Sequence, residues 1–151
     1  MENGKILEVN YYEDSKIFEL KNSHISYIMN ILENKQLGHL YFGKQIKCTS
    51  LLNKSLQHRE RGVQACVFEG EDTPRVYPEY GTSDYRHPAY QIRNADGNTI
   101  SRLVYKSHKI YQGKPKLKGL PATYVNQESE AMTLEITLMD DYLRLEVILK
   151  F

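Results

Sequence analysis

With 151 residues, the chain has the size of one domain and enough length to bury a substantial hydrophobic core. Its 20 lysines and arginines balance 19 aspartates and glutamates, so a net charge of +1 gives no field that favours nucleic acid or an anionic membrane. The two cysteines, Cys48 and Cys66, are too few for a disulfide framework or a zinc site and indicate free thiols in a cytoplasmic protein.

Neither a membrane span nor a metal or cofactor site is predicted. The longest apolar runs are only a few residues, and polar Glu2, Asn3 and Lys5 stand where a signal peptide would begin its apolar stretch. The five histidines are far apart, with no cysteine or aspartate at ligand spacing, and the glycines fall singly instead of in a phosphate-binding loop. We therefore expect a cytoplasmic protein that needs no metal and no cofactor.

Four short strands are predicted in the first part of the chain, because β-branched and aromatic residues over 6–12, 17–20, 25–32 and 37–42 are separated by polar turns. Short turns between successive strands indicate an antiparallel meander. Alternation in the second strand places Phe18 and Leu20 on one face and Glu19 on the opposite, solvated face.

Residues 44–74 differ from the four predicted strands, because apolar and polar residues do not alternate cleanly there and an apolar run resumes only at 65–68. We interpret them as a long excursion with one short strand, and long excursions from compact domains are often functional. The excursion carries the charged cluster His58-Arg59-Glu60-Arg61.

An ordered crossover is predicted for residues 77–88, where two prolines stand among several tyrosines, including Tyr80. Gly81 supplies a backbone turn that a side chain would resist. Asp84 and Arg86 lie two apart, so on an extended backbone they point the same way and can form a charge-assisted pair.

The second half of the chain continues the β pattern. A strand at 89–93, a turn at 94–97 and a strand at 100–110 predict a hairpin, and a turn-rich stretch follows at 111–121. The last hairpin, 134–138 and 143–151, alternates apolar and charged residues around the turn at Asp140-Asp141. Because no segment sustains a helical period, the predicted class is an all-β, antiparallel sandwich of two packed sheets with little helix.

The alternation is still uninterrupted at Phe151, the final residue. We therefore expect the natural domain to continue past Phe151, or its last strand to be completed by another chain. An uncapped apolar edge also predicts self-association of the 151-residue chain through that strand.

Most carboxylates are predicted to be solvated, either on outward strand positions or in turns: Glu19, Glu135 and Glu146, or Asp14, Asp96 and Asp140. Glycosidic hydrolysis needs two carboxylates that face each other across a pocket. The acids on ordered loops are Glu69, Glu71, Asp72, Glu79 and Asp84, of which Asp84 is better explained by Arg86 and the run near Glu71 looks exposed. The chain alone does not look like a self-contained enzyme.

The 12 tyrosines admit two interpretations. Aromatic pairs on strands stabilise sheets, which is the favoured one. Alternatively, flat rings suit the apolar face of a pyranose, although the chain contains no tryptophan.

Several ordered blocks carry a family resemblance that covers nearly the whole chain: residues 18–44, 58–72, 77–92, 96–115 and 117–140. In this order they resemble the amino-terminal domain of the α-galactosidases of glycoside hydrolase family 36. One departure is Arg75-Val76, where the family usually has Gln-Glu before the Tyr-Pro of the crossover.

The resemblance implies a β-sandwich of the supersandwich, galactose mutarotase-like type that precedes a (β/α)8 barrel. That barrel, absent from this chain, carries the two aspartates of a retaining mechanism that removes terminal α-galactose from oligosaccharides such as melibiose and raffinose. Many bacterial members resemble one another in forming tetramers, in which a loop of this domain reaches a neighbouring active site. By position, that loop corresponds to the excursion, with Arg59, Arg61 and His58 as the substrate-adjacent candidates. Ordinary surface positions for these residues remain the alternative.

Two functions therefore stay open at the level of the sequence. The favoured one is a non-catalytic sandwich domain that supports the barrel and the oligomer of an α-galactosidase. The other is a free-standing carbohydrate-binding or adhesion module that uses its tyrosines.

Overall fold

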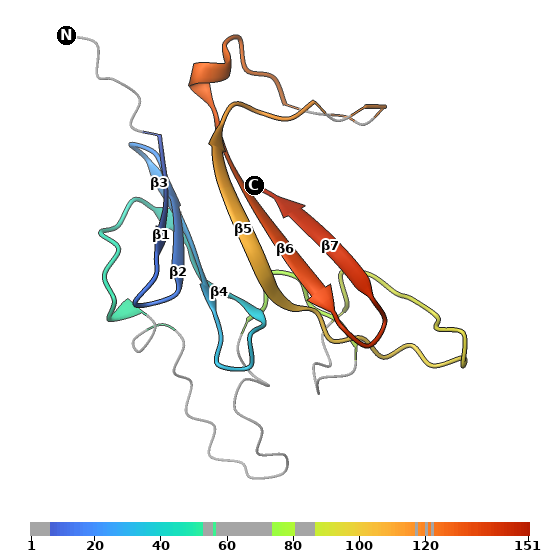
Figure 1. The fold of residues 1–151 in the computed structure, drawn as a ribbon. Helices are drawn as coiled ribbons and strands as arrows, with labels where there is room; N and C mark the ends of the chain where they lie inside the picture. The colour runs from blue at the N-terminus through green and yellow to red at the C-terminus, as the bar shows by residue number, and fades with distance from the viewer. Residues whose placement is uncertain are drawn as a thin grey trace, which may run out of the picture.

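Two antiparallel β-sheets pack face to face in the computed structural model, which describes residues 7–52, 56, 74–80, 87–116, 118–119, 121 and 123–151 (Figure 1). The first sheet has the order β1-β2-β3-β4, with β1 (Glu8–Tyr12), β2 (Ile17–Lys21), β3 (Ile25–Ile31) and β4 (Leu37–Lys44). The second has the order β5-β6-β7, with β5 (Val104–Gln112), β6 (Met132–Asp140) and β7 (Leu145–Lys150). A short 3-10 helix, η1 (Glu128–Glu130), precedes β6. The predicted all-β sandwich is confirmed.

The first sheet is the predicted meander, in which each strand pairs antiparallel with the next. Its turns close on local bonds: the Asn22 side chain accepts the N–H of His24 at 2.8 Å and of Ile25 at 2.9 Å. Lys16 (φ 53°) and Lys35 (φ 66°) adopt the left-handed conformation at the other two turns. Residues 65–68, predicted as a strand, lie outside the described part of the chain.

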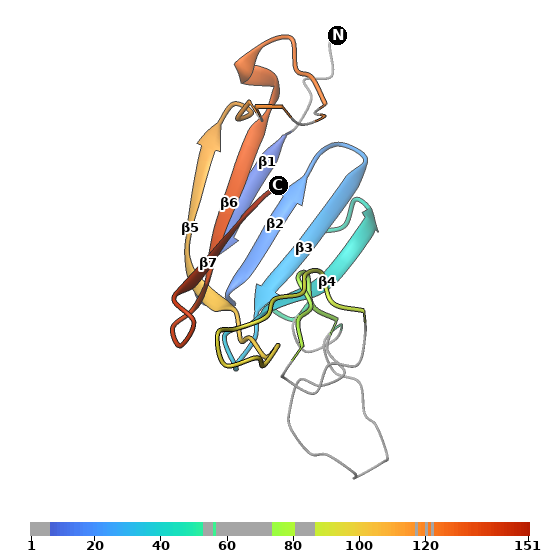
Figure 2. The ribbon, with the colours of Figure 1, turned by 90° about the vertical axis from the view of Figure 1, so that its right-hand side faces the viewer.

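The last hairpin is also confirmed, with β6 and β7 in antiparallel register from Asp140↔Leu145 to Glu135↔Lys150. The turn between them closes with Arg144 at a φ of 53°. Figure 2, turned by 90°, shows how these strands cross in front of the first sheet.

The hairpin predicted from 89–93 and 100–110 is wrong. The turn exists, since Gly97 has a φ of 88° and the Asn94 N–H donates to the Asn98 carbonyl at 2.8 Å, but residues 87–103 form no strand. The Ser101 N–H instead donates to the Tyr80 carbonyl at 3.2 Å, and β5 starts at Val104 and pairs with β6. The backbone donors needed for the predicted hairpin are therefore engaged elsewhere.

The main core lies between the sheets and draws residues from both. Its buried members are Val9, Phe18, Met29, Ile31, Leu37, Leu103, Leu134, Ile136 and Leu138. Burying side chains of this size contributes about 1.5–3 kcal/mol each, which makes this core the main stabilising feature of the domain.

A second cluster covers the outer face of the first sheet, where Ile17, Ile28 and Leu40 are buried against the half-buried side chains of the 46–52 stretch. Both faces of β2 are therefore covered, and the prediction of a solvated Glu19 is wrong. Glu19 is fully buried, and its Oε2 accepts from the Tyr12 hydroxyl at 2.8 Å and lies 3.5 Å from Lys21 Nζ. No helix in the described residues is long and apolar enough to cross a membrane.

Candidate functional site

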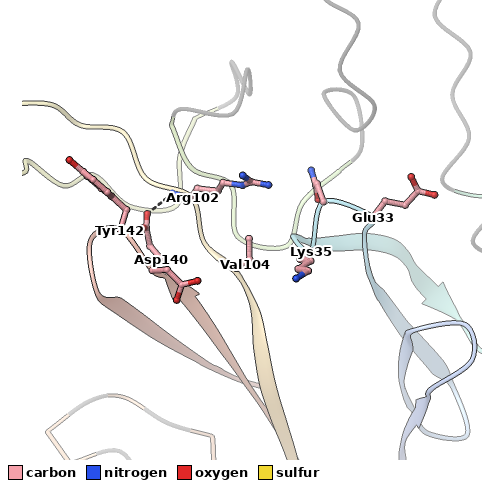
Figure 3. A pocket seen from close by; sticks show the side chains of 8 residues that line it. Glu33, Lys35, Arg102, Val104, Asp140 and Tyr142 are labelled. Carbon is pink, nitrogen blue, oxygen red and sulfur yellow. Dashed lines mark hydrogen bonds between the residues drawn. The ribbon is translucent and has the colours of Figure 1, made fainter.

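An open hollow of about 380 Å³ lies at one end of the sandwich, where the β3–β4 turn, the segment leading into β5 and the β6–β7 turn meet (Figure 3). Charged and polar side chains dominate its lining: Glu33, Asn34, Lys35, Arg102, Val104, Asp140, Asp141 and Tyr142. Arg102 extends toward the β3–β4 turn, whereas the Tyr142 ring points away from it. The Tyr105 N–H donates to the Lys35 carbonyl at 2.7 Å and ties the two sheets together beside the hollow.

Asp140 is a structural carboxylate of this end. It is 4% exposed, and its two oxygens accept the N–H of Arg102 at 2.7 Å and of Leu143 at 3.0 Å. The prediction that Asp140 is a solvated turn residue is therefore wrong, because its side chain bonds the β6–β7 turn to the segment before β5. Both oxygens are held by main-chain donors, which suits a fixed anchor more than an exchanging acid or base.

Glu79 forms a second buried anchor and is 2% exposed. Its Oε1 accepts from Gln36 Nε2 at 2.7 Å, and its Oε2 accepts the Leu103 N–H at 2.8 Å and the Tyr90 hydroxyl at 3.3 Å. Burial raises the pKa of this carboxyl, while these donors and the charge of Arg75 oppose the rise. One side chain thus joins the β3–β4 turn, the crossover and the segment before β5.

The Tyr90 hydroxyl extends the network to Ser101, with which it forms a short hydrogen bond. Burial, as the largest cause, raises the pKa of Tyr90 to about 12, so the phenol stays protonated and donates. The Tyr90 ring stacks on Tyr77 with centroids 5.4 Å apart and planes 14° apart. Tyr77 and Tyr90 therefore pack against each other and against the core.

The segment that leads into the crossover follows the edge of β4. The His39 N–H donates to the Pro74 carbonyl at 2.7 Å, and the Val76 N–H donates to the Leu37 carbonyl at 3.1 Å. The Ala89 N–H then closes on the Pro78 carbonyl at 2.8 Å. Of the crossover predicted at 77–88, residues 81–86 lie outside the described part of the chain, so its order as a whole stays a prediction.

The predicted site residues fall largely outside the described residues. This holds for the substrate-adjacent candidates His58, Arg59 and Arg61, for the crossover residues Gly81, Asp84 and Arg86, and for the loop acids Glu69, Glu71 and Asp72. Tyr80 is described, and its side chain is 40% exposed beside the Glu79 anchor.

Two described histidines have aromatic neighbours: the His39 ring lies 5.6 Å from Tyr27, and the His108 ring lies 4.4 Å from Tyr11. Burial lowers the pKa of both histidines, which favours neutral rings at pH 7. Within the described ranges, no group of three or more His, Cys, Asp or Glu side chains could hold a metal ion.

Sequence reasoning singled out Glu79 as a loop acid but missed its partner Gln36. A carboxylate between a proline and a tyrosine, in a stretch rich in aromatic residues, is the signal that could have indicated burial. Gln36 gives no comparable signal, because its side chain reaches Glu79 across 43 residues of sequence.

Comparisons with known proteins place the chain beside α-galactosidases. A family model described as the glycosyl hydrolase family 36 N-terminal domain matches residues 35–151. Alpha-galactosidase AgaA of Geobacillus stearothermophilus is 38% identical over 151 residues, which cover 96% of this chain and 21% of that protein.

Solved structures agree with this. The crystal structure of the α-galactosidase AgaB from the same organism matches with a TM-score of 0.80 at 40% identity and covers 95% of this chain and 20% of that chain. A variant of AgaA in complex with raffinose matches with a TM-score of 0.78 at 39% identity, over 89% of this chain and 20% of that chain. The chain thus spans about a fifth of the length of the relatives that it matches.

Proposed function

Because the chain belongs to the glycosyl hydrolase family 36 N-terminal domain family, we propose that it is the non-catalytic β-sandwich of an α-galactosidase. In this proposal the whole protein removes terminal α-galactose from oligosaccharides such as raffinose, the ligand of one matched relative. The two carboxylates that react belong to the part of the whole protein that lies outside this chain. The sandwich supports that catalytic part and the oligomer.

The observation that carries the proposal is the hydrogen bonding of the two carboxylates that are buried at the end of the sandwich where the hollow lies. Both Glu79 oxygens and both Asp140 oxygens accept hydrogen bonds from protein donors at 2.7–3.3 Å. A glycosidase acid or nucleophile must instead present a carboxylate to the sugar across a pocket. These two side chains are better suited to holding loops in place than to proton transfer.

The test is turnover of nitrophenyl α-galactoside and of raffinose by the full-length protein and by the 151-residue chain. We expect hydrolysis by the full-length protein and none by the chain alone, because the two acid residues lie outside it. Turnover by the purified chain, abolished by Glu79→Gln, would refute the proposal.

We also propose that the full-length protein is an oligomer in which the excursion lends Arg59 or Arg61 to a neighbouring active site. Guanidinium groups donate planar hydrogen bonds that suit sugar hydroxyls or an acid beside them. Arg59→Ala and Arg61→Ala are each compared with Arg93→Ala, an exposed arginine on a described segment. We expect a higher KM for raffinose from one of the first two variants only, with the oligomer unchanged in sedimentation. Equal KM values for all three variants would contradict the loop proposal.

A further inference from the structure

The hollow at the end of the sandwich has walls that the chain itself holds in place. Asp140 accepts the Arg102 N–H and also bonds to the β6–β7 turn. Within the β3–β4 turn, Asn34 Oδ1 accepts the Gln36 N–H at 3.0 Å, and Asn34 Nδ2 donates to Gln36 Oε1 at 2.8 Å. Gln36 in turn donates to the buried Glu79 at 2.7 Å. The walls therefore need no ligand to order them, which lowers the entropic cost of binding one.

Four charged side chains and one tyrosine of this lining have no hydrogen-bond or ion-pair partner within the described part of the chain. They are Glu33, Lys35, Arg102, Asp141 and Tyr142, all of them exposed. Arg102 extends toward the β3–β4 turn, which carries Lys35 (Figure 3). Cations and carboxylates thus surround one hollow without pairing with each other.

Lysines on the strands behave differently, because they do form ion pairs. Lys21 Nζ lies 2.9 Å from the Glu8 carboxylate, and Lys150 Nζ lies 3.0 Å from the Glu135 carboxylate. The opposite charges around the hollow make no such contact within the described residues. Each of them therefore keeps its hydrogen-bonding capacity for a molecule that enters the hollow.

The balance of charge around the hollow favours a neutral ligand. Lys35 and Arg102 attract an anion, but Glu33 and Asp141 repel it, and the reverse holds for a cation. Sugar hydroxyls both donate and accept hydrogen bonds, so they can engage the two cations and the two carboxylates together. The Tyr142 ring, 84% exposed, adds a flat apolar surface of the kind that packs on a pyranose. The volume of about 380 Å³ lies within the range of small-molecule sites.

We propose that the hollow binds one hexose unit of a neutral oligosaccharide. Lys35 and Arg102 donate hydrogen bonds to the hydroxyl oxygens of the sugar, and Glu33 and Asp141 accept from its O–H groups. Because the hollow is open and its lining is polar, the bound sugar keeps part of its hydration, and we expect a Kd on the order of 1 mM. The inference rests on the proposed function in the choice of raffinose as the probe.

Acetylation of lysines in the full-length protein, resolved by peptide mass spectrometry, tests the proposal at single residues. At about 20 mM raffinose, roughly twentyfold above the expected Kd, acetylation of Lys35 should slow by at least about fivefold. Lys16 is the internal control, because it is also exposed and left-handed in a turn of the first sheet but does not line the hollow; its rate should not change. An unchanged Lys35 rate, or protection by inorganic phosphate in place of raffinose, would overturn the proposal.

Cleavage of raffinose, followed in the same samples, tests the proposed function separately. Cleavage without protection of Lys35 would refute the hexose site alone. Protection of Lys35 without cleavage would refute the proposed function alone.

A pair of glycine variants shows whether the protection comes from the hollow. Glycine suits the left-handed backbone at Lys35 (φ 66°) and at Lys16 (φ 53°), so Lys35→Gly and Lys16→Gly each remove a side chain without straining the turn. Labelling of the Asp141 carboxylate with a carbodiimide and an amine reports on the hollow in both full-length proteins. We expect the raffinose concentration for half-protection of Asp141 to rise by at least about fivefold in Lys35→Gly, which loses a charged donor, and to keep the wild-type value in Lys16→Gly. Equal concentrations for the two variants would overturn the proposal.

Discussion

Removing the Glu79 carboxylate should destabilise the domain more than removing any exposed carboxylate. Glu79 is 2% exposed and accepts three hydrogen bonds, from Gln36, Tyr90 and the Leu103 backbone. Glu79→Ala leaves the Gln36 amide and the Leu103 N–H buried without this acceptor, each at about 1–3 kcal/mol, whereas the Tyr90 hydroxyl can still bond to Ser101. Relief of the cost of burying the charge offsets part of this loss, so we expect the free energy of unfolding to fall by about 2–4 kcal/mol. Glu79→Gln keeps the shape and one acceptor oxygen and should lose about 1–2 kcal/mol.

Urea unfolding followed by circular dichroism measures these differences. Glu13→Ala is the matched control, because Glu13 is exposed and its loss should change stability by less than about 0.5 kcal/mol. A Glu79→Ala protein within about 1 kcal/mol of the wild type would refute the description of Glu79 as the anchor that joins three segments.

The same comparison has a definite dependence on pH. Burial raises the folded-state pKa of Glu79 above its ordinary value of 4.5, so the folded protein holds this proton more tightly than the unfolded chain does. The stability that this carboxyl contributes is therefore fully present below pH 4.5 and falls as the pH rises through the folded pKa. Glu8 and Glu135, whose pKa values are lowered by Lys21 and Lys150, have the opposite dependence but are present in both proteins. The difference in unfolding free energy between wild type and Glu79→Gln should thus shrink with rising pH, and a difference that grows would contradict the raised pKa.

Three further changes test other parts of the fold. Asp140→Ala should cost about 2–4 kcal/mol in urea unfolding, because two buried backbone N–H groups lose their acceptor; no loss would show that the turn is held otherwise. Gly38→Ala should lower the free energy of unfolding by about 2–3 kcal/mol, since a Cβ there would lie 2.8 Å from a buried leucine methyl group. The loss should be smaller for Gly43→Ala, where the nearest atom is the tip of a tyrosine side chain. A larger loss for Gly43→Ala than for Gly38→Ala would refute this description of the packing. Burial raises the pKa of Cys48 to about 11, so in a Cys66→Ser background iodoacetamide should alkylate Cys48 on the order of 100-fold more slowly at pH 8 than free cysteine, and an equal rate would contradict the burial.

The parts of the fold that follow from local pattern could be predicted from the sequence. The meander of β1 to β4 and the β6–β7 hairpin each show apolar positions separated by short polar turns, which determine pairing between neighbouring strands. The prediction of a hairpin from 89–93 and 100–110 was wrong, although the turn between these segments is present. The backbone N–H groups of Ser101 and Leu103 bond to Tyr80 and Glu79, and no local sequence pattern reveals these partners.

The buried carboxylates could not be placed from alternation. Glu19 and Asp140 occupy positions that look solvated along their own strands. Each is buried by residues distant in sequence: the 46–52 stretch returns over the outer face of β2, and the segment before β5 bonds to Asp140. When residues distant in sequence cover a charged side chain on a strand, that side chain is a buried structural group instead of a solvated one.

The order of the strands along the chain also determines when each sheet can form during biosynthesis. All partners of the first sheet are adjacent in sequence, so its four strands can pair as soon as residue 44 leaves the ribosome. The β6–β7 hairpin, which supplies much of the opposing core, is complete only at Lys150. At typical elongation rates this leaves Phe18 and Met29 uncovered on the nascent chain for roughly 5–20 s. We expect chaperones that bind apolar strands to engage the nascent polypeptide in that interval and to release it once the second sheet closes.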